Sequence, residues 1–467
     1  MSLDNLPVEW LLVTLEHICK KIQDGNYGGD YPKAEEWMES GIPFITGAAL
    51  TNSGIAKEKL KYISVEKNSL LKKAQTTEGD VIFPNRGATE AQKFGGAKIA
   101  YTLGKDYEVS NINPQITLLR AEEGILPKYI EYLVSSPLFL EAYRESAKGS
   151  ALGFMNLSKT KAINVPLITT LEQQEIVRQL DVMLAQVEQI KARLDAIPAI
   201  LKKFRQSVLA DVVSGELINQ DFNQLPVESF SDYLTDVRYG TSKKCSESLI
   251  DAVPVLRIPN IADDGTLDFT NLKYAEFESK EIKQLQLSKG DLLLIRSNGS
   301  LDLVGKSAIA DELDKVVLYA GYLIRLRFND SVNPQFIQYF LQAPQTRQTI
   351  ENIARSTSGV NNINSKEIAG LKIQLPCIDH QNEVVLRVKQ LLELSKRIEE
   401  TIKSAQKRVN LLTQSILAKA FSGELTAEWR EQHQELIIGI NSAESLLAKI
   451  QAEREANKPV KKAKKVK

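Results

Sequence analysis

The chain contains two versions of one sequence, and this repeat limits its possible folds more than any other feature. RQSVLADVVSGEL at 205–217 recurs as TQSILAKAFSGEL at 413–425. Earlier in each copy, LPKYIEYLVSSP at 126–137 is matched by NPQFIQYFLQAP at 333–344. Because the similar segments keep their order along the chain, we expect two copies of one structural unit.

Composition places the chain among ordinary globular proteins. Its 467 residues are enough for about two to four domains, because one core rarely exceeds roughly 250–300 residues. No apolar run has the length of a membrane span, and the first ten residues lack the pattern of a secretory signal. Cys19, Cys245 and Cys377 are too scattered for a disulfide framework or a zinc cluster, so a cytoplasmic location is expected.

The 59 basic and 59 acidic residues cancel, which counts mildly against a nucleic-acid partner. A chain of several domains can still carry local basic surfaces, and a subunit can share the neutralisation of phosphates with a partner. The ending KPVKKAKKVK at 458–467 is expected to be disordered. Two roles are open for it, contact with DNA phosphates or solubility.

Each copy begins with a part of mixed structure, residues 7–166 and 225–376. Short β-like runs such as DVIFP at 80–84 alternate with segments rich in glycine and proline. One short amphipathic helix is expected after Pro127 and another after Pro334. The pattern predicts a compact α/β globule with long irregular loops.

Each copy ends in a long helix whose apolar residues recur every 3.5 positions, the period of a left-handed coiled coil. Gly215 and Gly423 stand where a glycine ends a helix, and Pro198 is expected to bend the first helix without ending it. Ser395 and Ala405 weaken the second apolar stripe. The stripe positions are Ile176, Leu180, Met183, Val187, Ile190, Leu194, Ile197, Leu201, Phe204 and Val208, then Val384, Val388, Leu391, Ser395, Ile398, Ile402, Ala405, Val409, Leu412 and Ile416.

A lone helix cannot bury such a stripe, whereas two helices of equal length can bury each other's. We therefore predict an α/β (α+β) repeat, in which two globular domains are separated by two long antiparallel coiled-coil helices. A pseudo-twofold axis is expected to relate the two halves. Segment 424–450 is expected to pack against the N-terminal region and close this arrangement.

Motifs for catalysis are missing. GSLDLVGKS at 299–307 has five residues between its glycines where a phosphate-binding loop has four. NPQI at 113–116 and NPQF at 333–336 lack the second proline of the Asn-Pro-Pro-aromatic motif of amino-methyltransferases. The three histidines show no metal-ligand spacing. No catalytic residue, metal or cofactor is predicted on this chain, which is interpreted as a non-catalytic protein.

The loops of the mixed domains are rich in side chains that contact DNA. Arginine reads guanine through two hydrogen bonds, asparagine or glutamine reads adenine, and lysine, serine and threonine contact phosphates. Solvated turns use the same residue types, and this alternative stays open for any single residue. A scaffold kept in two copies with different loops favours the reading of two different DNA half-sequences. The candidate DNA-binding residues are Asn26, Tyr27, Lys33, Asn85, Arg86, Lys148, Ser150 and Lys159 in the first copy, and Tyr239, Lys243, Lys244, Arg257, Asn260, Arg296, Asn298, Arg355, Thr357, Asn361 and Asn362 in the second.

Four segments carry a resemblance to a known family. They are LPVEW at 6–10, the long segment from VPLITTLEQQEIVRQL to SVLADVVSGEL at 165–217, LTQSILAKAFSGELTAEWR at 412–430, and ELIIGINSAESLLAKIQAERE at 435–455. With these segments the chain resembles the specificity subunit of type I restriction-modification systems, and the enterobacterial type IA class in particular.

The resemblance implies two target recognition domains, 1–168 and 217–377, each reading one half of a bipartite asymmetric DNA site. A central spacer helix at 169–216 and a C-terminal spacer helix at 378–423 would set the unread gap, and 424–467 would hold a closing segment and the lysine-rich tail. The helices would dock two modification (methyltransferase) subunits, which carry S-adenosylmethionine and methylate adenine N6. Restriction subunits, ATP-dependent translocases and endonucleases, would join this core. S-adenosylmethionine, ATP and Mg are therefore expected on the partner subunits.

The repeated ending of each helix is expected to serve one methyltransferase subunit. Gln206, Ser207, Gln414 and Ser415 are the candidate partner-binding residues, and outward positions of a coiled coil are the alternative. Two rival functions remain. A coiled-coil scaffold without DNA specificity would lack salt-dependent DNA affinity. A free-standing methyltransferase or nucleotide hydrolase would bind S-adenosylmethionine or ATP.

Overall fold

The computed structural model describes residues 6–51, 54–85, 99–147, 156–247, 252–311, 313–355 and 360–457. The chain divides into two compact units. Unit 1 is Met1–Asp195 with Lys403–Lys467, and unit 2 is Ala196–Ile402. The lysine-rich tail lies outside the described residues.

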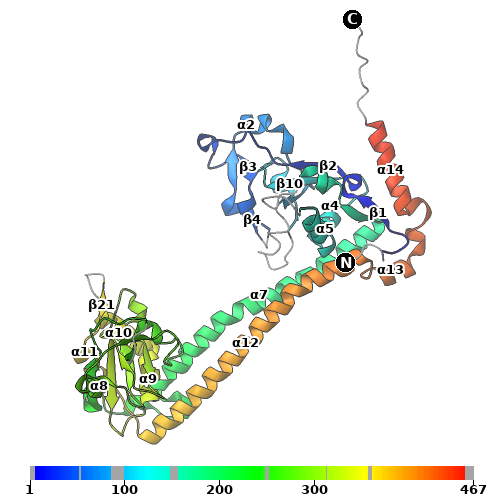
Figure 1. The fold of residues 1–467 in the computed structure, drawn as a ribbon. Coiled ribbons are helices and arrows are strands. Elements are labelled where there is room, and N and C mark those ends of the chain that lie inside the picture. Colours follow the sequence, from blue (N-terminus) through cyan, green and yellow to red (C-terminus); the bar gives the residue numbers. More distant parts are fainter. Residues whose placement is uncertain are drawn as a thin grey trace. The chain divides into compact units, whose positions relative to one another are not determined.

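Two helices of 45 residues each contribute to both units. They are α7 (Thr170–Ser214) and α12 (Ile378–Ser422), the long green and orange helices of Figure 1. Gly215 and Gly423 follow them, each at φ 87°, a left-handed conformation that glycine adopts at little cost at a helix end. Pro198 lies inside α7, which continues through it.

Within each unit the two helices pack antiparallel. In unit 1, Ile176 from the start of α7 shares a buried core with Phe421 from the end of α12. In unit 2, Val212 from the end of α7 shares a buried core with Val384 from the start of α12. The prediction of two long antiparallel helices is confirmed.

The predicted apolar stripe is buried unevenly, since Ile190 is 44% exposed and Ile398 is 37% exposed. The weak position Ser395 has a polar explanation in unit 2. Its hydroxyl accepts a hydrogen bond from Nε of Arg205 at 2.9 Å, and Arg205 also forms an ion pair with Glu399 at 2.6 Å. A polar cross-helix contact therefore replaces an apolar one at this point of the stripe.

Two small sheets form the globular part of unit 1. The first has the strand order β2 (Cys19–Asp24), β10 (Ile116–Ala121), β7 (Val81–Pro84), β8 (Tyr101–Thr102), with antiparallel neighbours. The second has the order β6 (Lys61–Ile63), β3 (Ile42–Ile45), β9 (Asn111–Ile112), and β3 pairs parallel with β9. Two further ladders pair β1 (Leu11–Thr14) with β11 (Asn164–Leu167), and β4 (Leu50–Thr51) with β5 (Gly54–Ile55).

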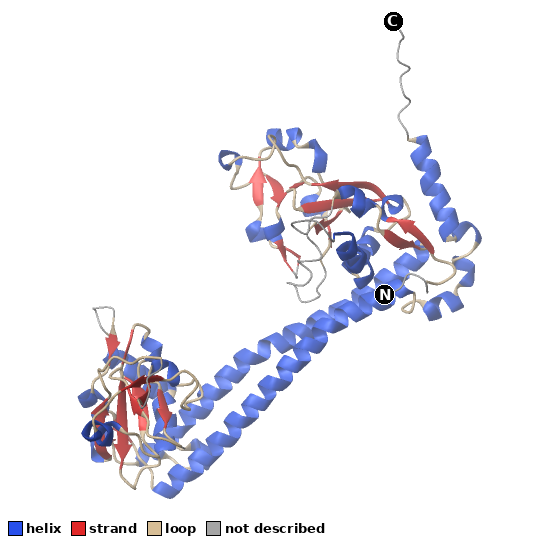
Figure 2. Ribbon diagram, in the orientation of Figure 1, coloured by secondary structure: helices blue, strands red, loops and turns tan. Residues whose placement is uncertain are grey.

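Unit 2 repeats the strand orders of the four-stranded and three-stranded sheets and of the β1–β11 ladder. Figure 2 shows the strands of both units in red. Its larger sheet has the order β13 (Leu234–Tyr239), β20 (Leu323–Phe328), β16 (Leu292–Ile295), β18 (Ser307–Ile309). Its smaller sheet has the order β15 (Lys273–Ala275), β14 (Val253–Leu256), β19 (Leu318–Tyr319), and β14 pairs parallel with β19. Here β12 (Glu228–Ser229) pairs with β22 (Lys372–Ile373), and β17 (Ser297–Asn298) with β21 (Asn361–Asn362).

Each globular part packs two consecutive helices against its sheet. In unit 1 they are α4 (Pro127–Ser135) and α5 (Pro137–Ala147), and in unit 2 α9 (Pro334–Gln342) and α10 (Pro344–Ala354). The helices after Pro127 and Pro334 were predicted, and the second of each pair was not. The shorter helices are α1 (Leu15–Ile18), α2 (Val65–Leu70), α6 (Leu157–Lys161), α8 (Ser279–Leu285) and α11 (Ser365–Ala369).

One buried glutamine per unit joins the long helix to the domain in front of it. Gln173 Oε1 accepts the backbone N–H of Leu126 at 2.8 Å, next to α4. Gln381 Oε1 accepts the backbone N–H of Asn333 at 2.8 Å, next to α9. Both side-chain amides donate to two backbone carbonyls. Since both glutamines are fully buried and satisfied, the repeat extends to individual hydrogen bonds.

Residues after α12 pack against the N-terminal region of unit 1, as predicted. They form α13 (Ala427–Gln432) and α14 (Ala443–Ala456). The fully buried carboxylate of Glu172 accepts hydrogen bonds from Trp10 Nε1 at 3.0 Å, Thr426 Oγ1 at 2.8 Å and Arg430 Nη1 at 2.7 Å. This charge-assisted cluster joins the first residues of the chain, the start of α7 and α13.

Candidate nucleic-acid interface

The strand ends of the larger sheet in unit 2 open into a hollow of about 720 Å³. Tyr239 at the end of β13 and Arg296 after β16 line it, together with Lys243, Arg257 and Lys273. Tyr322, which is 63% exposed, adds a second aromatic ring. Among the described residues its lining has four cationic side chains and no acidic one, the chemistry that favours a phosphate backbone and stacked bases. The other lining residues are Gly240, Thr241, Ser242, Cys245, Ile258, Pro259, Ser297, Ala320 and Gly321.

Two of these cations are paired with acidic side chains around the hollow. Lys243 Nζ lies 2.7 Å from Glu281 Oε2, and Lys273 Nζ lies 2.7 Å from Glu247 Oε1. Both pairs are partly solvated, so their energetic contribution is small. In Arg257, Nη2 donates to the carbonyl of Asn271 at 3.1 Å, whereas the buried Nε has no hydrogen-bond partner in the described part of the chain.

Arg296 makes three contacts with its surroundings. Its guanidinium carbon lies 4.7 Å from the centre of the Tyr239 ring, a cation–π contact. Nε donates to Asn362 Oδ1 at 3.3 Å, and Nη1 donates to the carbonyl of Gly321 at 3.4 Å. The Tyr239 hydroxyl accepts the backbone N–H of Ser365 at 2.9 Å, at the start of α11. Several elements of unit 2 therefore position this one guanidinium.

The same point of the fold in unit 1 is defined by the same backbone hydrogen bonds. The N–H of Asn85 donates to Gln115 as that of Arg296 donates to Tyr322, both at 2.9 Å. The N–H of Gly25 donates to Ile116, and that of Gly240 donates to Leu323. Asn85 is therefore the structural counterpart of Arg296, and Asp24, before Gly25, is the counterpart of Tyr239.

The side chains at this point of unit 1 are carboxylate and amide groups. Asp24 Oδ1 accepts a hydrogen bond from Thr117 Oγ1 at 2.6 Å. Burial raises the pKa of Asp24, while the Thr117 hydroxyl, the positive charge of Lys73 and the Asn85 amide oppose this rise. Asn85 Nδ2 donates to the Pro114 carbonyl at 2.6 Å, and its buried Oδ1 has no partner among the described residues.

The remaining candidates of unit 1 differ in exposure. Asn26 is buried, and its Nδ2 donates to Asn111 Oδ1 at 2.5 Å. Tyr27 is 67% exposed, and Lys73 Nζ lies 3.9 Å from the centre of its ring. Lys33 is exposed in the following loop, and Lys159 Nζ donates to the carbonyl of Ser146 at 2.7 Å.

In unit 2, Asn260 is buried and its Nδ2 donates to the carbonyl of Asp268 at 2.8 Å. Asn298 and Asn361 face each other in the β17–β21 ladder beside Arg296, and Asn362 contacts Arg296 itself. Lys244 and Arg355 are exposed outside the hollow. Arg86, Lys148, Ser150 and Thr357 lie outside the described residues.

The candidate partner-binding residues lie on the long helices. Gln206, Ser207 and Ser415 are exposed, and Gln414 is half-buried. Gln206 also borders a small hollow of about 260 Å³ beside Pro198 and Arg205 of α7 and Glu399 of α12, all in unit 2. Their predicted role stays a prediction.

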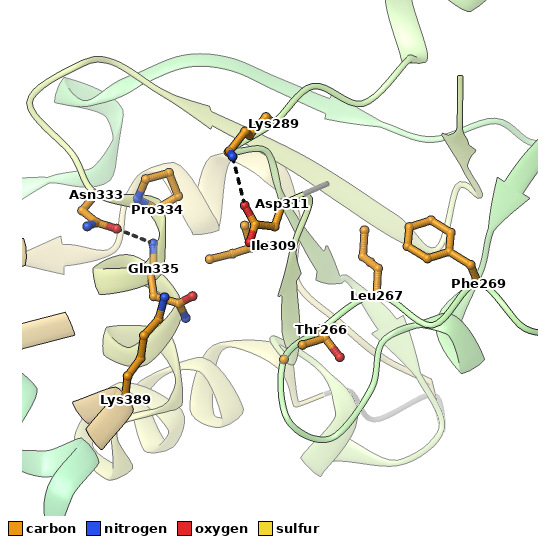
Figure 3. Close-up of a pocket in the computed structure, with 12 residues that line it drawn as sticks. Thr266, Leu267, Phe269, Lys289, Ile309, Asp311, Asn333, Pro334, Gln335 and Lys389 are labelled. Carbon is orange, nitrogen blue, oxygen red and sulfur yellow. Dashed lines mark hydrogen bonds and ion pairs between the residues drawn. The ribbon is translucent and has the colours of Figure 1, made fainter. Parts of the chain in front are cut away.

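A separate pocket of about 390 Å³ in unit 2 contains none of the candidate residues (Figure 3). Lys289 and Asp311 form an exposed ion pair at 3.5 Å on its wall, and Asn333 caps α9 through the N–H of Gln335 at 2.9 Å. Lys389 of α12 completes the lining.

Several residues of the two equivalent sites were not predicted from the sequence. They are Asp24, Lys73, Gln115, Lys273, Tyr322 and Ser365. Asp24 and Tyr239 each directly precede a glycine, but that signal is too common to select them. Among the described residues, no group of three or more His, Cys, Asp or Glu side chains is placed to hold a metal ion. None of the described helices has the length and apolar character needed to cross a membrane.

Comparison with known proteins agrees with this geometry. The family model described as "Type I restriction modification DNA specificity domain" matches residues 7–199 and 241–405. The type I restriction enzyme EcoKI specificity subunit of Escherichia coli (strain K12) is 38% identical over 347 residues, covering 73% of this chain and 74% of that protein. The StySPI specificity subunit of Salmonella potsdam is 36% identical over 342 residues, covering 72% and 73%.

Solved structures share the fold. A chain from a structure of a type I R-M system has a TM-score of 0.65 at 17% identity, covering 90% of this chain and 99% of its own. The HsdS subunit from Thermoanaerobacter tengcongensis has a TM-score of 0.60 at 16% identity, covering 90% and 98%. At these identities the likeness concerns the fold alone. The match of the family model to both copies and the two relatives together show that the chain belongs to the family of type I restriction-modification DNA specificity subunits.

Proposed function

We propose that the chain is the non-catalytic subunit that gives a type I restriction-modification complex its DNA specificity, with each globular part reading one half of a bipartite asymmetric site. Residues 1–168 and 217–377 are the two target recognition domains in this proposal. The observation that carries it is the pair of equivalent sites. One set of backbone hydrogen bonds presents Asp24 and Asn85 in unit 1, and Tyr239 and Arg296 in unit 2.

Different side chains on one backbone frame suit the reading of two different short sequences. The half-buried carboxylate of Asp24 can accept hydrogen bonds from base amino groups, whereas the guanidinium of Arg296 can donate to guanine. The four cations of the hollow in unit 2 suit the neighbouring phosphates. A protein that recognised a symmetric site would need the same side chains in both copies.

The long helices are proposed to set the gap between the half-sites and to dock two modification subunits. Their equal length of 45 residues and their antiparallel packing within each unit support this role. The exposed Gln206, Ser207 and Ser415 and the half-buried Gln414 are the proposed contacts. S-adenosylmethionine, ATP and Mg would be bound by the partner subunits.

The test is single-molecule sequencing of DNA methylation in cells with and without this gene, with the partner methyltransferase present. A bipartite adenine-methylated motif that disappears with the gene is the expected result. If methylation is the same in both strains while the methyltransferase is active on another specificity subunit, the proposal fails. A coiled-coil scaffold without DNA specificity would then be the better description.

A second test addresses the helices. Inserting four residues after Gln189, within α7, should lengthen the preferred gap and leave both half-sites unchanged. The same sequencing would report both quantities at once. A change in the half-sites themselves would contradict the proposed division of labour.

A further inference from the structure

The guanidinium of Arg296 is positioned by three contacts at the edge of the hollow in unit 2. The Tyr239 ring supports one face, Asn362 holds Nε, and the Gly321 carbonyl holds Nη1. The β17–β21 ladder pairs Ser297 with Asn362, so the backbones that carry both partners are joined as well. An arginine held in this way loses little conformational entropy when it binds a ligand.

The contacts leave a defined edge of the guanidinium available. They use the Nε hydrogen and one hydrogen of Nη1, and the described part of the chain supplies no acceptor to the remaining Nη1–Nη2 edge. Two parallel N–H groups on this edge match an acceptor pair on one ligand. In the DNA major groove that pair is O6 and N7 of guanine. A phosphate offers two acceptors as well, but it would not require the aromatic support and the two side contacts.

The support of Arg296 is itself braced. The Tyr239 hydroxyl accepts the N–H of Ser365 and donates to Oγ of the same residue at 3.1 Å. Asn364 caps the helix that begins at Ser365 by accepting the N–H groups of Lys366 and Glu367. The ring is therefore anchored by α11, and a change in Tyr239 should act on DNA through Arg296.

We propose that Arg296 is a specificity-determining residue that selects a guanine in the half-site read by the second recognition domain, with Tyr239 as its positioning residue. This inference rests on the proposed function. It adds to that function the base that is selected, guanine, the residue that donates to it, Arg296, and the domain that carries this residue, the second recognition domain. The equivalent Asn85 in unit 1 cannot make the same contact, so the requirement applies to one half-site only.

The experiment uses the complete methyltransferase complex and compares Arg296→Lys with the wild type. Lysine keeps the positive charge but loses the two-pronged geometry. In Arg296→Lys, we expect the ratio of methylation at the wild-type site to methylation at sites substituted at one guanine to fall about 10- to 100-fold. The base preference in the other half-site should be unchanged. Tyr239→Leu should give a smaller relaxation at the same base, and Tyr239→Phe the smallest.

Lys243→Gln is the control, because it removes one charge from the same hollow. It should weaken DNA binding similarly on all sequences and reduce the slope of log affinity against log salt by about 1. An intact first half-site in every variant shows that the complex is still folded.

The outcomes distinguish a failure of the proposed function from a failure of the Arg296 assignment. If the wild-type complex gives no bipartite motif, the proposed function fails. If the motif exists and Arg296→Lys leaves every base preference unchanged, or changes both half-sites, the assignment of Arg296 is wrong. A uniform loss like that of Lys243→Gln would make Arg296 a phosphate contact and would also overturn it.

Discussion

The two recognition domains agree in backbone and differ in chemistry at one shared point. In unit 1 this point carries the half-buried Asp24 carboxylate and the buried Asn85 amide. In unit 2 it carries Tyr239 and Arg296, which offer an aromatic face and a cationic donor. The strand order of the two larger sheets and the backbone hydrogen bonds around the point are the same. The scaffold thus sets where these side chains stand, and in the proposed function the side chains decide which base is read.

A second difference lies away from this point. In unit 1 the segment after α12 adds α13 and α14, and the buried Glu172 joins α13 to Trp10. The corresponding third residue of α12 is the half-buried His380, which has no such cluster among the described residues. Unit 1 therefore depends on pieces from both ends of the chain, whereas unit 2 is continuous in sequence.

The largest effect is expected from filling the space at the shared point. A Cβ on Gly25 would lie 1.9 Å from the Asn113 carbonyl oxygen, and one on Gly240 would lie 2.2 Å from that of Tyr319. Gly25→Ala and Gly240→Ala should each cost about 3 kcal/mol, the upper end for overpacking. Each should also abolish recognition of its own half-site. Thermal unfolding and methylation sequencing would measure both effects.

Gly104→Ala and Gly299→Ala are matched controls, since a Cβ on either glycine meets no atom within 4 Å. They should leave stability and motif close to those of the wild type. If Gly25→Ala altered both half-sites, the equivalence of the two points would lose its functional meaning.

The next largest effect is expected from breaking the ion pair by which Arg430 of α13 binds Glu172 in unit 1. Arg430→Met would leave the buried Glu172 carboxylate without its cationic partner but with its hydrogen bonds from Trp10 and Thr426. The cost should be about 1.5–3 kcal/mol, the range for losing a hydrogen bond to a charged group. Hydrogen exchange should rise in unit 1 and stay unchanged in unit 2. Arg397→Met breaks an exposed pair with Glu393 and should cost less than about 0.5 kcal/mol. Equal changes of hydrogen exchange in both units would contradict the conclusion that only unit 1 depends on the Glu172 cluster.

A symmetric effect is expected from the two buried glutamines. Gln173→Ala and Gln381→Ala each remove hydrogen bonds to three backbone groups, so each should cost about 2 kcal/mol in its own unit. Gln432→Ala, on an exposed helix face, should be close to neutral. Costs that differ strongly between Gln173 and Gln381 would show that the repeat is less regular in energy than in geometry.

The smallest effect is expected from Asp24→Asn. Burial raises the pKa of Asp24, so its charged form costs stability above the folded-state pKa. This cost disappears as the pH falls through that value toward the ordinary range of a carboxyl group. The variant should gain less than about 1 kcal/mol at pH 7 and nothing at pH 3, measured by denaturant unfolding. A gain at pH 3 equal to that at pH 7 would show that the charge is not the cause.

The elements that were predicted correctly are those with local sequence signals. The long helices, the glycines that follow them and the helices after Pro127 and Pro334 were predictable, because periodicity and end signals are local. The helices that begin at Pro137 and Pro344 were missed, since a one-residue break separates them from their predecessors.

The candidate site was predicted only in part. Tyr239, Lys243, Arg257 and Arg296 were selected by chemistry and line one hollow. Asn26 and Asn260 were selected by the same reasoning, yet both are buried. Asn26 donates to Asn111 of β9, and Asn260 donates to a carbonyl of its own loop. Asparagine serves both purposes, and only the path of the backbone distinguishes them.

By itself, the sequence determined that this protein is a duplicated unit with two heptad helices, because order and periodicity survive without knowledge of contacts. Its tertiary structure alone decided that Asp24 meets Asn85, and that Tyr239 meets Arg296, at an equivalent point of each unit. The physical reason is that each pair comes from strands far apart in the chain, and only the hydrogen-bonded register of the sheets brings them to one point.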